Sequence, residues 1–188
     1  MLAAIPILFA FQQWIEGSQW IAQHPSSMSL LLGYAYLFFA FLLWPIYIPI
    51  TAYFLEASTR VKKLFRWWIG IGAVVTLAML GVLATQRLSV ELLPAGIFYN
   101  INVPLGLGGM LLYIGATCGS LLCSSHRTVR WIGFIGILTA AFSAFVFNQT
   151  FTSVWCFFAA ILSGWIFFII KQQRTENLKK IPRRSKKA

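Results

Sequence analysis

The positive charge of this chain is confined to three short regions, and long apolar stretches separate them. Fourteen of the fifteen Lys and Arg residues lie between Arg60 and Arg66, between Arg127 and Arg130, or from Lys171 to the C-terminus. The gaps between alternate apolar stretches carry almost no charge. Proteins that cross a membrane several times show this pattern, because their cytoplasmic loops collect Lys and Arg. The sequence therefore predicts a membrane topology before it predicts any chemistry.

Composition supports the lipid bilayer as the solvent. The chain is 59% hydrophobic and 10% charged, whereas soluble domains are about 25% charged. The net charge of +11 could suggest nucleic acid as a partner. We expect no nucleic acid, because the basic residues cap the ends of apolar segments instead of forming one face.

Six segments are long and apolar enough to approach the ~20 residues that a spanning helix needs. They run over residues 2–23, 30–55, 64–85, 103–123, 129–148 and 153–170. The predicted fold class is therefore all-α, a polytopic bundle of six transmembrane helices that forms one domain over residues 1–170.

The loops after the second, fourth and sixth segments hold the basic clusters, and the loops after the other segments hold only Arg87. This bias predicts a protein of the cell membrane with both termini in the cytoplasm. Residues 171–188 carry eight Lys or Arg against Glu176, which predicts a disordered basic tail that attracts anionic lipid headgroups.

The first apolar segment carries a polar stripe. Gln12, Glu16, Gln19 and Gln23 follow the i, i+4, i+7, i+11 spacing, so they share one face of a helix. A polar stripe that faced lipid would be costly. We expect the stripe to face neighbouring helices or water.

Glu16 is the strongest candidate for function, because an ionised carboxylate is costly in hydrocarbon. Such a group could bind a cation, relay a proton or anchor a polar ligand. It could equally be a structural hydrogen-bond acceptor for another helix. The predicted ligand or proton site consists of Glu16, Gln12, Gln13, Gln19 and Asn148. Asn148 could instead belong to a plain loop and helix cap.

Proline and glycine predict local features. Pro45 and Pro49 predict a kink near residues 41–49. The run from 87 to 102 contains Pro-Ala-Gly between short apolar runs, which favours a short hairpin or an interfacial lid. Gly115 and Gly119 predict close helix packing, within the chain in preference to a dimer.

Two further glycines, Gly133 and Gly136, predict close packing of the fifth segment in the same way. Glu56 ends the second segment beside a basic loop, and we expect it to pair with Arg60 or Lys63.

The sequence holds no Asp and no recognisable hydrolase, metalloprotease or nucleotide-binding motif. The three cysteines form neither a disulfide framework nor a metal pattern. We expect no metal or cofactor, and an enzyme is the least favoured class. Enzymatic activity would need a nucleophile such as Ser153 or Cys156 beside Glu16, and no motif places them together.

Three stretches together resemble an uncharacterised family of small bacterial integral membrane proteins. They are Gln12-Gln13-x-x-Glu16-Gly17-x-x-Trp20, Trp44-Pro45-x-Tyr47-x-Pro49 and Ser153-Val154-Trp155-Cys156-Phe157-Phe158-Ala159-Ala160. The resemblance covers residues 6–165. It implies that an additional N-terminal helix can precede the first segment, giving seven helices. It implies no substrate and no reaction.

Two functional hypotheses remain open. The leading one is transport, or the binding of a small ligand or lipid, through the polar site around Glu16. The alternative is a structural or assembly partner in a membrane protein complex, which the small size and glycine-rich helices favour.

Overall fold

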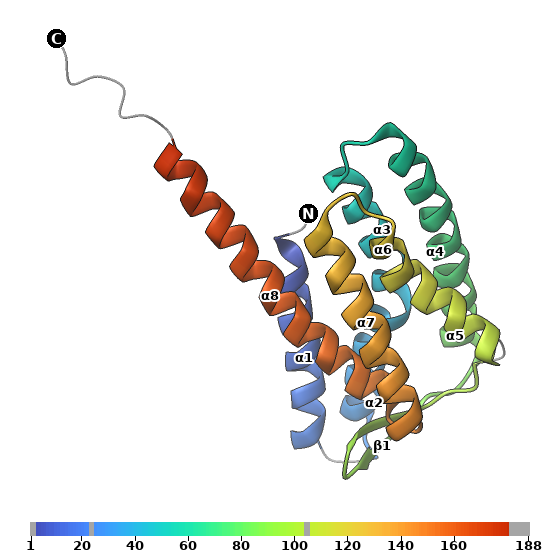
Figure 1. Cartoon of the computed structure of the whole chain (residues 1–188). Coiled ribbons are helices and arrows are strands. Elements are labelled where there is room, and N and C mark those ends of the chain that lie inside the picture. The colour runs from blue at the N-terminus through green and yellow to red at the C-terminus, as the bar shows by residue number, and fades with distance from the viewer. Residues whose placement is uncertain (1–2, 23–24, 104–105, 181–188) are drawn as a thin grey trace.

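The computed structural model describes residues 3–22, 25–103 and 106–180, with side chains as far as residue 167. These residues form six helical rods and one β-hairpin, arranged as in Figure 1. Four rods are single α-helices: α1 (Ala4–Ile21), α4 (Thr59–Thr85), α7 (Arg127–Val146) and α8 (Phe151–Lys180). The prediction of an all-α fold with six helices is confirmed.

The other two rods each contain a π-helical segment. The second rod consists of α2 (Ser27–Leu37), η1 (Phe38–Leu43) and α3 (Trp44–Leu55). The fourth consists of α5 (Gly106–Ile114), η2 (Gly115–Gly119) and α6 (Ser120–Leu122). π-Helical turns often mark functional positions.

Several helix ends differ from the sequence prediction. The second rod begins at Ser27 because the Ser26 hydroxyl accepts a hydrogen bond from the Ser29 N–H at 3.1 Å, which caps the helix. Helix α4 begins at Thr59, so the basic residues lie in its first turns. Helix α8 continues to Lys180, beyond the predicted end at residue 170. Residues 181–188 of the predicted tail lie outside the described residues.

The segment after α4 is the predicted hairpin. Strands β1 (Ser89–Leu93) and β2 (Gly96–Asn100) pair antiparallel, with Val90 opposite Tyr99. The buried side chains of the hairpin, Val90, Ile97 and Tyr99, belong to the main hydrophobic core. The hairpin therefore closes one end of the bundle (Figure 1).

The α3–α4 and α6–α7 loops meet at the opposite end. Glu56 accepts hydrogen bonds from the N–H groups of Ala57, Ser58 and Ser125, at 2.8–3.1 Å. Burial alone would raise the pKa of Glu56, but these donors lower it to about 2. The expected pairing with Arg60 or Lys63 is therefore replaced by contacts to loop backbone.

The physical reason is the burial of Glu56, which is 3% exposed. Buried N–H groups need acceptors, whereas an ion pair with an exposed Lys or Arg is worth little. Because one carboxylate joins both loops, the two N-terminal basic clusters lie at the same end of the bundle.

The predicted distortion of the second rod is also present, displaced toward the N-terminus. The π-helical segment η1 ends immediately before Trp44-Pro45. Pro49 has no N–H to donate to the Pro45 carbonyl one turn earlier. Gly72 of α4 lies against that carbonyl, where a Cβ atom would come within 2.0 Å of the oxygen.

Glycines elsewhere allow similarly close packing within the chain. A Cβ atom at Gly133 would lie 2.7 Å from the Cys118 carbonyl oxygen, and one at Gly136 would lie 2.7 Å from the Cys118 sulfur. Gly115 and Gly119 face the ring of Trp68 in α4. The predicted role of these glycines in packing within the chain is confirmed.

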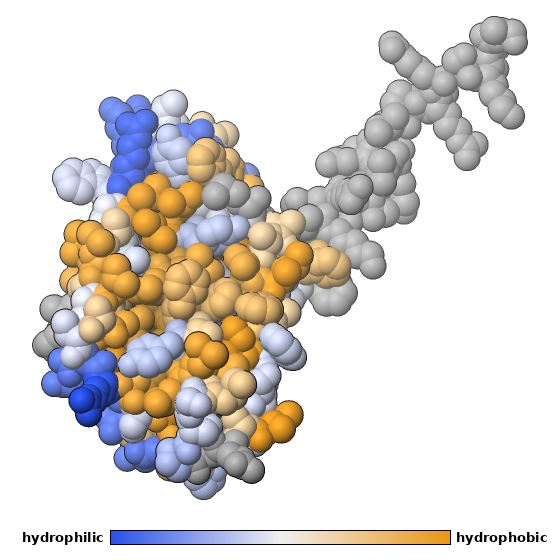
Figure 2. All heavy atoms as spheres, turned by 180° about the vertical axis from the view of Figure 1, so that it is seen from behind, coloured by the Kyte–Doolittle hydropathy of each residue, from blue (hydrophilic) through white to orange (hydrophobic). Residues whose placement is uncertain are grey.

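Three helices are long and apolar enough to cross a membrane: Ser27–Leu55, Thr59–Thr85 and Arg127–Val146. Gly106–Leu122 and Phe151–Phe167 are shorter apolar helices. Helix α1 belongs to neither group within the described residues, because its glutamines and Glu16 lower its hydropathy. Figure 2 shows an apolar band across one face of the molecule, between two more polar ends.

Candidate functional site

The polar stripe of α1 faces the protein interior. Gln12 and Gln19 are fully buried, and Glu16 is 6% exposed. Helix α1 packs against α2 and α8, and β2 packs against α8. The expectation that the stripe faces neighbouring elements is therefore confirmed for these three residues, while Gln23 lies outside the described residues.

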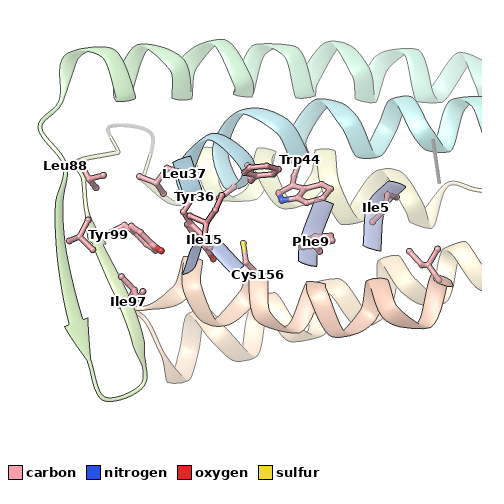
Figure 3. Close-up of a cluster of buried hydrophobic side chains, with 14 residues drawn as sticks. Ile5, Phe9, Ile15, Tyr36, Leu37, Trp44, Leu88, Ile97, Tyr99 and Cys156 are labelled. Atoms are coloured by element: carbon pink, nitrogen blue, oxygen red, sulfur yellow. The ribbon is translucent and has the colours of Figure 1, made fainter. Parts of the chain in front are cut away.

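An aromatic pair holds Gln12 at one end of the stripe. The Trp44 indole N–H donates to Gln12 Oε1 at 2.7 Å. The Trp44 ring stacks on Phe9 with centroids 3.9 Å apart (Figure 3). The amide nitrogen of Gln12 is buried and has no hydrogen-bond partner among the described residues.

A second aromatic pair lies at the other end of the stripe. Gln19 Nε2 donates to the Tyr99 hydroxyl at 2.8 Å. The Tyr99 ring stacks on Tyr36 with centroids 4.8 Å apart, and the Tyr36 hydroxyl donates to the Thr152 carbonyl at 3.3 Å. These contacts join α1, α2, β2 and the start of α8.

Glu16 lies between the two pairs. Its Oε2 accepts a hydrogen bond from Gln13 Nε2 at 3.1 Å. Its Oε1 is buried without a hydrogen-bond partner in the described part of the chain. The side chains of Ser153 and Tyr36 also face this carboxyl group.

The structure does not bring Asn148 into this cluster. Asn148 is exposed in the loop between α7 and α8. Ser153, in the first turn of α8, lies where Asn148 was expected and accepts a hydrogen bond from the Ile97 N–H at 3.2 Å. Gln12, Gln13, Glu16 and Gln19 are thus together, and Asn148 is apart.

Sequence reasoning missed the partners that other elements supply. Tyr36 and Tyr99 lie in no motif that marks them among the many aromatic residues of this chain. Trp44 lies in one of the three stretches that carry the family resemblance, but nothing in that stretch predicts its contact with Gln12. Ser153 and Cys156 lie in one of the three recognised stretches, and the structure turns both toward α1. Cys156 is 5% exposed and lies near Glu16 and Tyr36. Its sulfur atom points toward α1 (Figure 3).

An apolar cavity of about 100 Å³ lies beside the polar cluster, and neither Gln12 nor Glu16 lines it directly. Phe9, Trp44 and Cys156 form the wall that the cavity shares with the cluster. The cavity continues between α3, η2, α7 and α8, and Thr51 lines it with a buried hydroxyl that has no partner among the described residues.

A second cavity of about 190 Å³ lies between η1, α4, α5 and α8. Tyr113, Trp155 and Cys156 line both cavities. The rings of Tyr113 and Trp155 meet edge to face, with centroids 5.6 Å apart. Cys156 is therefore the point at which the two cavities and the polar cluster meet.

Comparison with known proteins places the chain in a family. The chain belongs to DUF6629, a family of unknown function. The match covers residues 1–181, which includes every residue of the polar cluster and both cavities. No curated protein and no solved structure matches the chain. The expected membership of an uncharacterised family is confirmed, and its bacterial origin stays an expectation.

Proposed function

We propose that this protein binds a small amphipathic molecule within the membrane, as a carrier or a binding protein. The polar group of the ligand contacts Gln12 and Glu16, and its apolar part occupies the adjoining cavity. The observation that carries the proposal is the pair of buried, unpartnered atoms, Gln12 Nε2 and Glu16 Oε1.

Unpartnered polar atoms are costly enough to require an explanation. A buried donor or acceptor without a partner costs about 1–3 kcal/mol, and more when it is charged. Most buried polar groups in proteins have a partner for this reason. Here one donor and one acceptor lie four residues apart on the same face of α1. A ligand that contacts both would recover part of that cost.

The cavity suits the apolar part of such a molecule. Its wall carries Ile5, Phe9, Ile48 and Trp155, so it offers mainly apolar contacts. A cavity of about 150 Å³ in another protein accommodates benzene. A volume of about 100 Å³ is smaller than that and suits a short alkyl chain. Small sites of this kind combine apolar walls with a few polar groups.

The membrane setting is part of the proposal. The three long apolar helices and the distribution of the basic clusters support a protein of the cell membrane with both termini in the cytoplasm. The basic C-terminal residues then lie beside anionic lipid headgroups. A ligand dissolved in the bilayer reaches the site laterally, between helices.

The test uses four tritiated probes that share a six-carbon chain: 1-hexanol, hexylamine, hexanoate and 2-aminohexan-1-ol. The purified protein is held in lipid nanodiscs, and saturable binding is measured by scintillation proximity. We expect saturable binding of at least one probe. Filling the cavity with Ala159→Phe should abolish it, and Ala141→Phe on the exposed face of α7 is the matched control.

Absence of saturable binding for all four probes, with the protein folded, contradicts the proposal. Equal binding by the Ala159→Phe and Ala141→Phe variants would place the bound probe elsewhere. In either case, stable co-purification with another membrane protein would favour the alternative hypothesis, a structural or assembly partner in a membrane protein complex.

A further inference from the structure

Among the described side chains, no positive group lies against the carboxyl group of Glu16. The side chains that act on it are those of Ser153, Gln13 and Tyr36, and none of these is cationic. The described Lys and Arg side chains lie in the first turns of α4 and α7, except Arg87. Arg87 is exposed at the start of the hairpin segment and forms no ion pair with Glu16.

The surroundings of Glu16 suit an organic cation. One stacked pair, Phe9 and Trp44, lies one turn toward the N-terminus of α1, where Trp44 contacts Gln12. The other, Tyr36 and Tyr99, lies one turn toward the C-terminus. Ammonium groups are attracted both to carboxylates and to aromatic faces, and the attraction increases when water is excluded.

Gln12 sets a second requirement for the polar group of the ligand. Its unpartnered atom is the amide nitrogen, which is a donor and therefore needs an acceptor. An ammonium group offers none. Side chains four residues apart on a helix have Cβ atoms about 5–6 Å from each other. A ligand that serves both groups carries its cation and an acceptor oxygen only a few bonds apart.

We propose that the polar group of the ligand is an amino alcohol, with the ammonium at Glu16 Oε1 and the hydroxyl oxygen at Gln12 Nε2. This inference rests on the function proposed above and specifies the ligand class of the same site. The hydroxyl hydrogen then points toward the aromatic wall or toward Ser153.

The same four probes test the inference, because they differ only in their polar groups. We expect affinity to decrease in the order 2-aminohexan-1-ol, hexylamine, 1-hexanol, and hexanoate should bind most weakly. Loss of the amine should reduce affinity at least tenfold, since hydrogen bonds to charged groups are the stronger class. Loss of the hydroxyl alone should reduce affinity several-fold.

Two variants separate the two contacts. Glu16→Gln should remove the preference for hexylamine over 1-hexanol, and Glu91→Gln, on the exposed face of the hairpin, is the matched control. Gln12→Leu should remove the advantage of the amino alcohol over hexylamine while hexylamine still binds. The unfolding temperature of each variant shows whether it is folded.

The outcomes of the binding test distinguish a failure of the amino-alcohol inference from a failure of the proposed binding function. If 1-hexanol binds as tightly as hexylamine, or Glu16→Gln keeps the preference for the amine, the inference is overturned while the binding function stands. If hexanoate binds best, the site selects an anion, and the inference is equally overturned. If no probe shows saturable binding, the proposed function itself fails.

Discussion

Replacing Gly72 with Ala should separate α3 from α4. The added Cβ atom would lie 2.0 Å from the Pro45 carbonyl oxygen and 2.9 Å from its carbon. Cβ contacts below 3.0 Å essentially do not occur, so the two backbones must move apart by about 1 Å, the difference between 3.0 and 2.0 Å. The atom that clashes belongs to the backbone of a helix, so no side-chain rotation relieves the contact.

The expected change in the free energy of unfolding of Gly72→Ala follows from two opposing effects. Overpacking costs about 1–3 kcal/mol, and a gap of 0.5–1 Å also removes a quarter to a half of the dispersion energy of each affected contact. Ala favours the helix over Gly by about 1 kcal/mol. We therefore expect a net loss of about 2 kcal/mol in the free energy of unfolding. For a chain of this size that loss lowers the unfolding temperature by about 4–8 °C.

Helix α4 provides its own controls for this measurement. Gly70 and Gly81 are exposed, and a Cβ atom at either position would meet no atom within 4 Å. Gly70→Ala and Gly81→Ala should leave the unfolding temperature unchanged or raise it slightly. Thermal unfolding in one detergent, followed by circular dichroism, compares the three variants. If Gly72→Ala unfolds at the same temperature as Gly70→Ala, the close approach of α3 and α4 is wrong.

Three further predictions concern hydrogen bonds and the hairpin. Glu56 has its pKa lowered from 4.5 to about 2, so its stabilisation is complete above pH 4.5 and lost as the pH falls to about 2. The difference in unfolding temperature between the wild-type protein and Glu56→Gln should shrink over that range, and a constant difference would contradict this. Trp44→Phe leaves Gln12 Oε1 without its donor and should cost about 1–3 kcal/mol, measured against Trp67→Phe on the exposed surface. Gly96→Ala would place a Cβ atom 2.8 Å from Ser153 Oγ at a positive φ of 155°. It should increase hydrogen exchange at the Ile97 N–H, and unchanged protection would count against the docking of the hairpin.

The sequence predicted the features that depend on composition and spacing. The six rods follow from the lengths of the apolar segments, and the burial of Gln12, Glu16 and Gln19 follows from their 3.6-residue period. The positions of the glycines predicted close packing within the chain. These features are local, so a single segment contains the information that determines them.

Features that depend on contacts between distant segments could not be predicted in the same way. Glu56 contacts Ser125, which is 69 residues away, and Tyr99 reaches Gln19 over 80 residues. Nothing in the spacing of either pair indicates the contact. Asn148 was expected in the site because it lies at the correct end of the bundle. The direction of α8 brings Ser153 there instead.

One explanation accounts both for the low hydropathy of α1 and for the burial of its polar face. A helix with Gln12, Glu16 and Gln19 on one face is a poor transmembrane segment alone, because each polar group would meet lipid. Trp44 donates a hydrogen bond to Gln12 Oε1 and Tyr99 accepts one from Gln19 Nε2, so the stripe is stabilised by α3 and by the hairpin. These contacts leave Glu16 Oε1 and Gln12 Nε2 without partners. Structure alone would be served by Leu at position 16, which would avoid the buried carboxylate at little loss of packing. The buried carboxylate between two aromatic pairs is therefore the feature for which the proposed binding function accounts and a purely structural role does not.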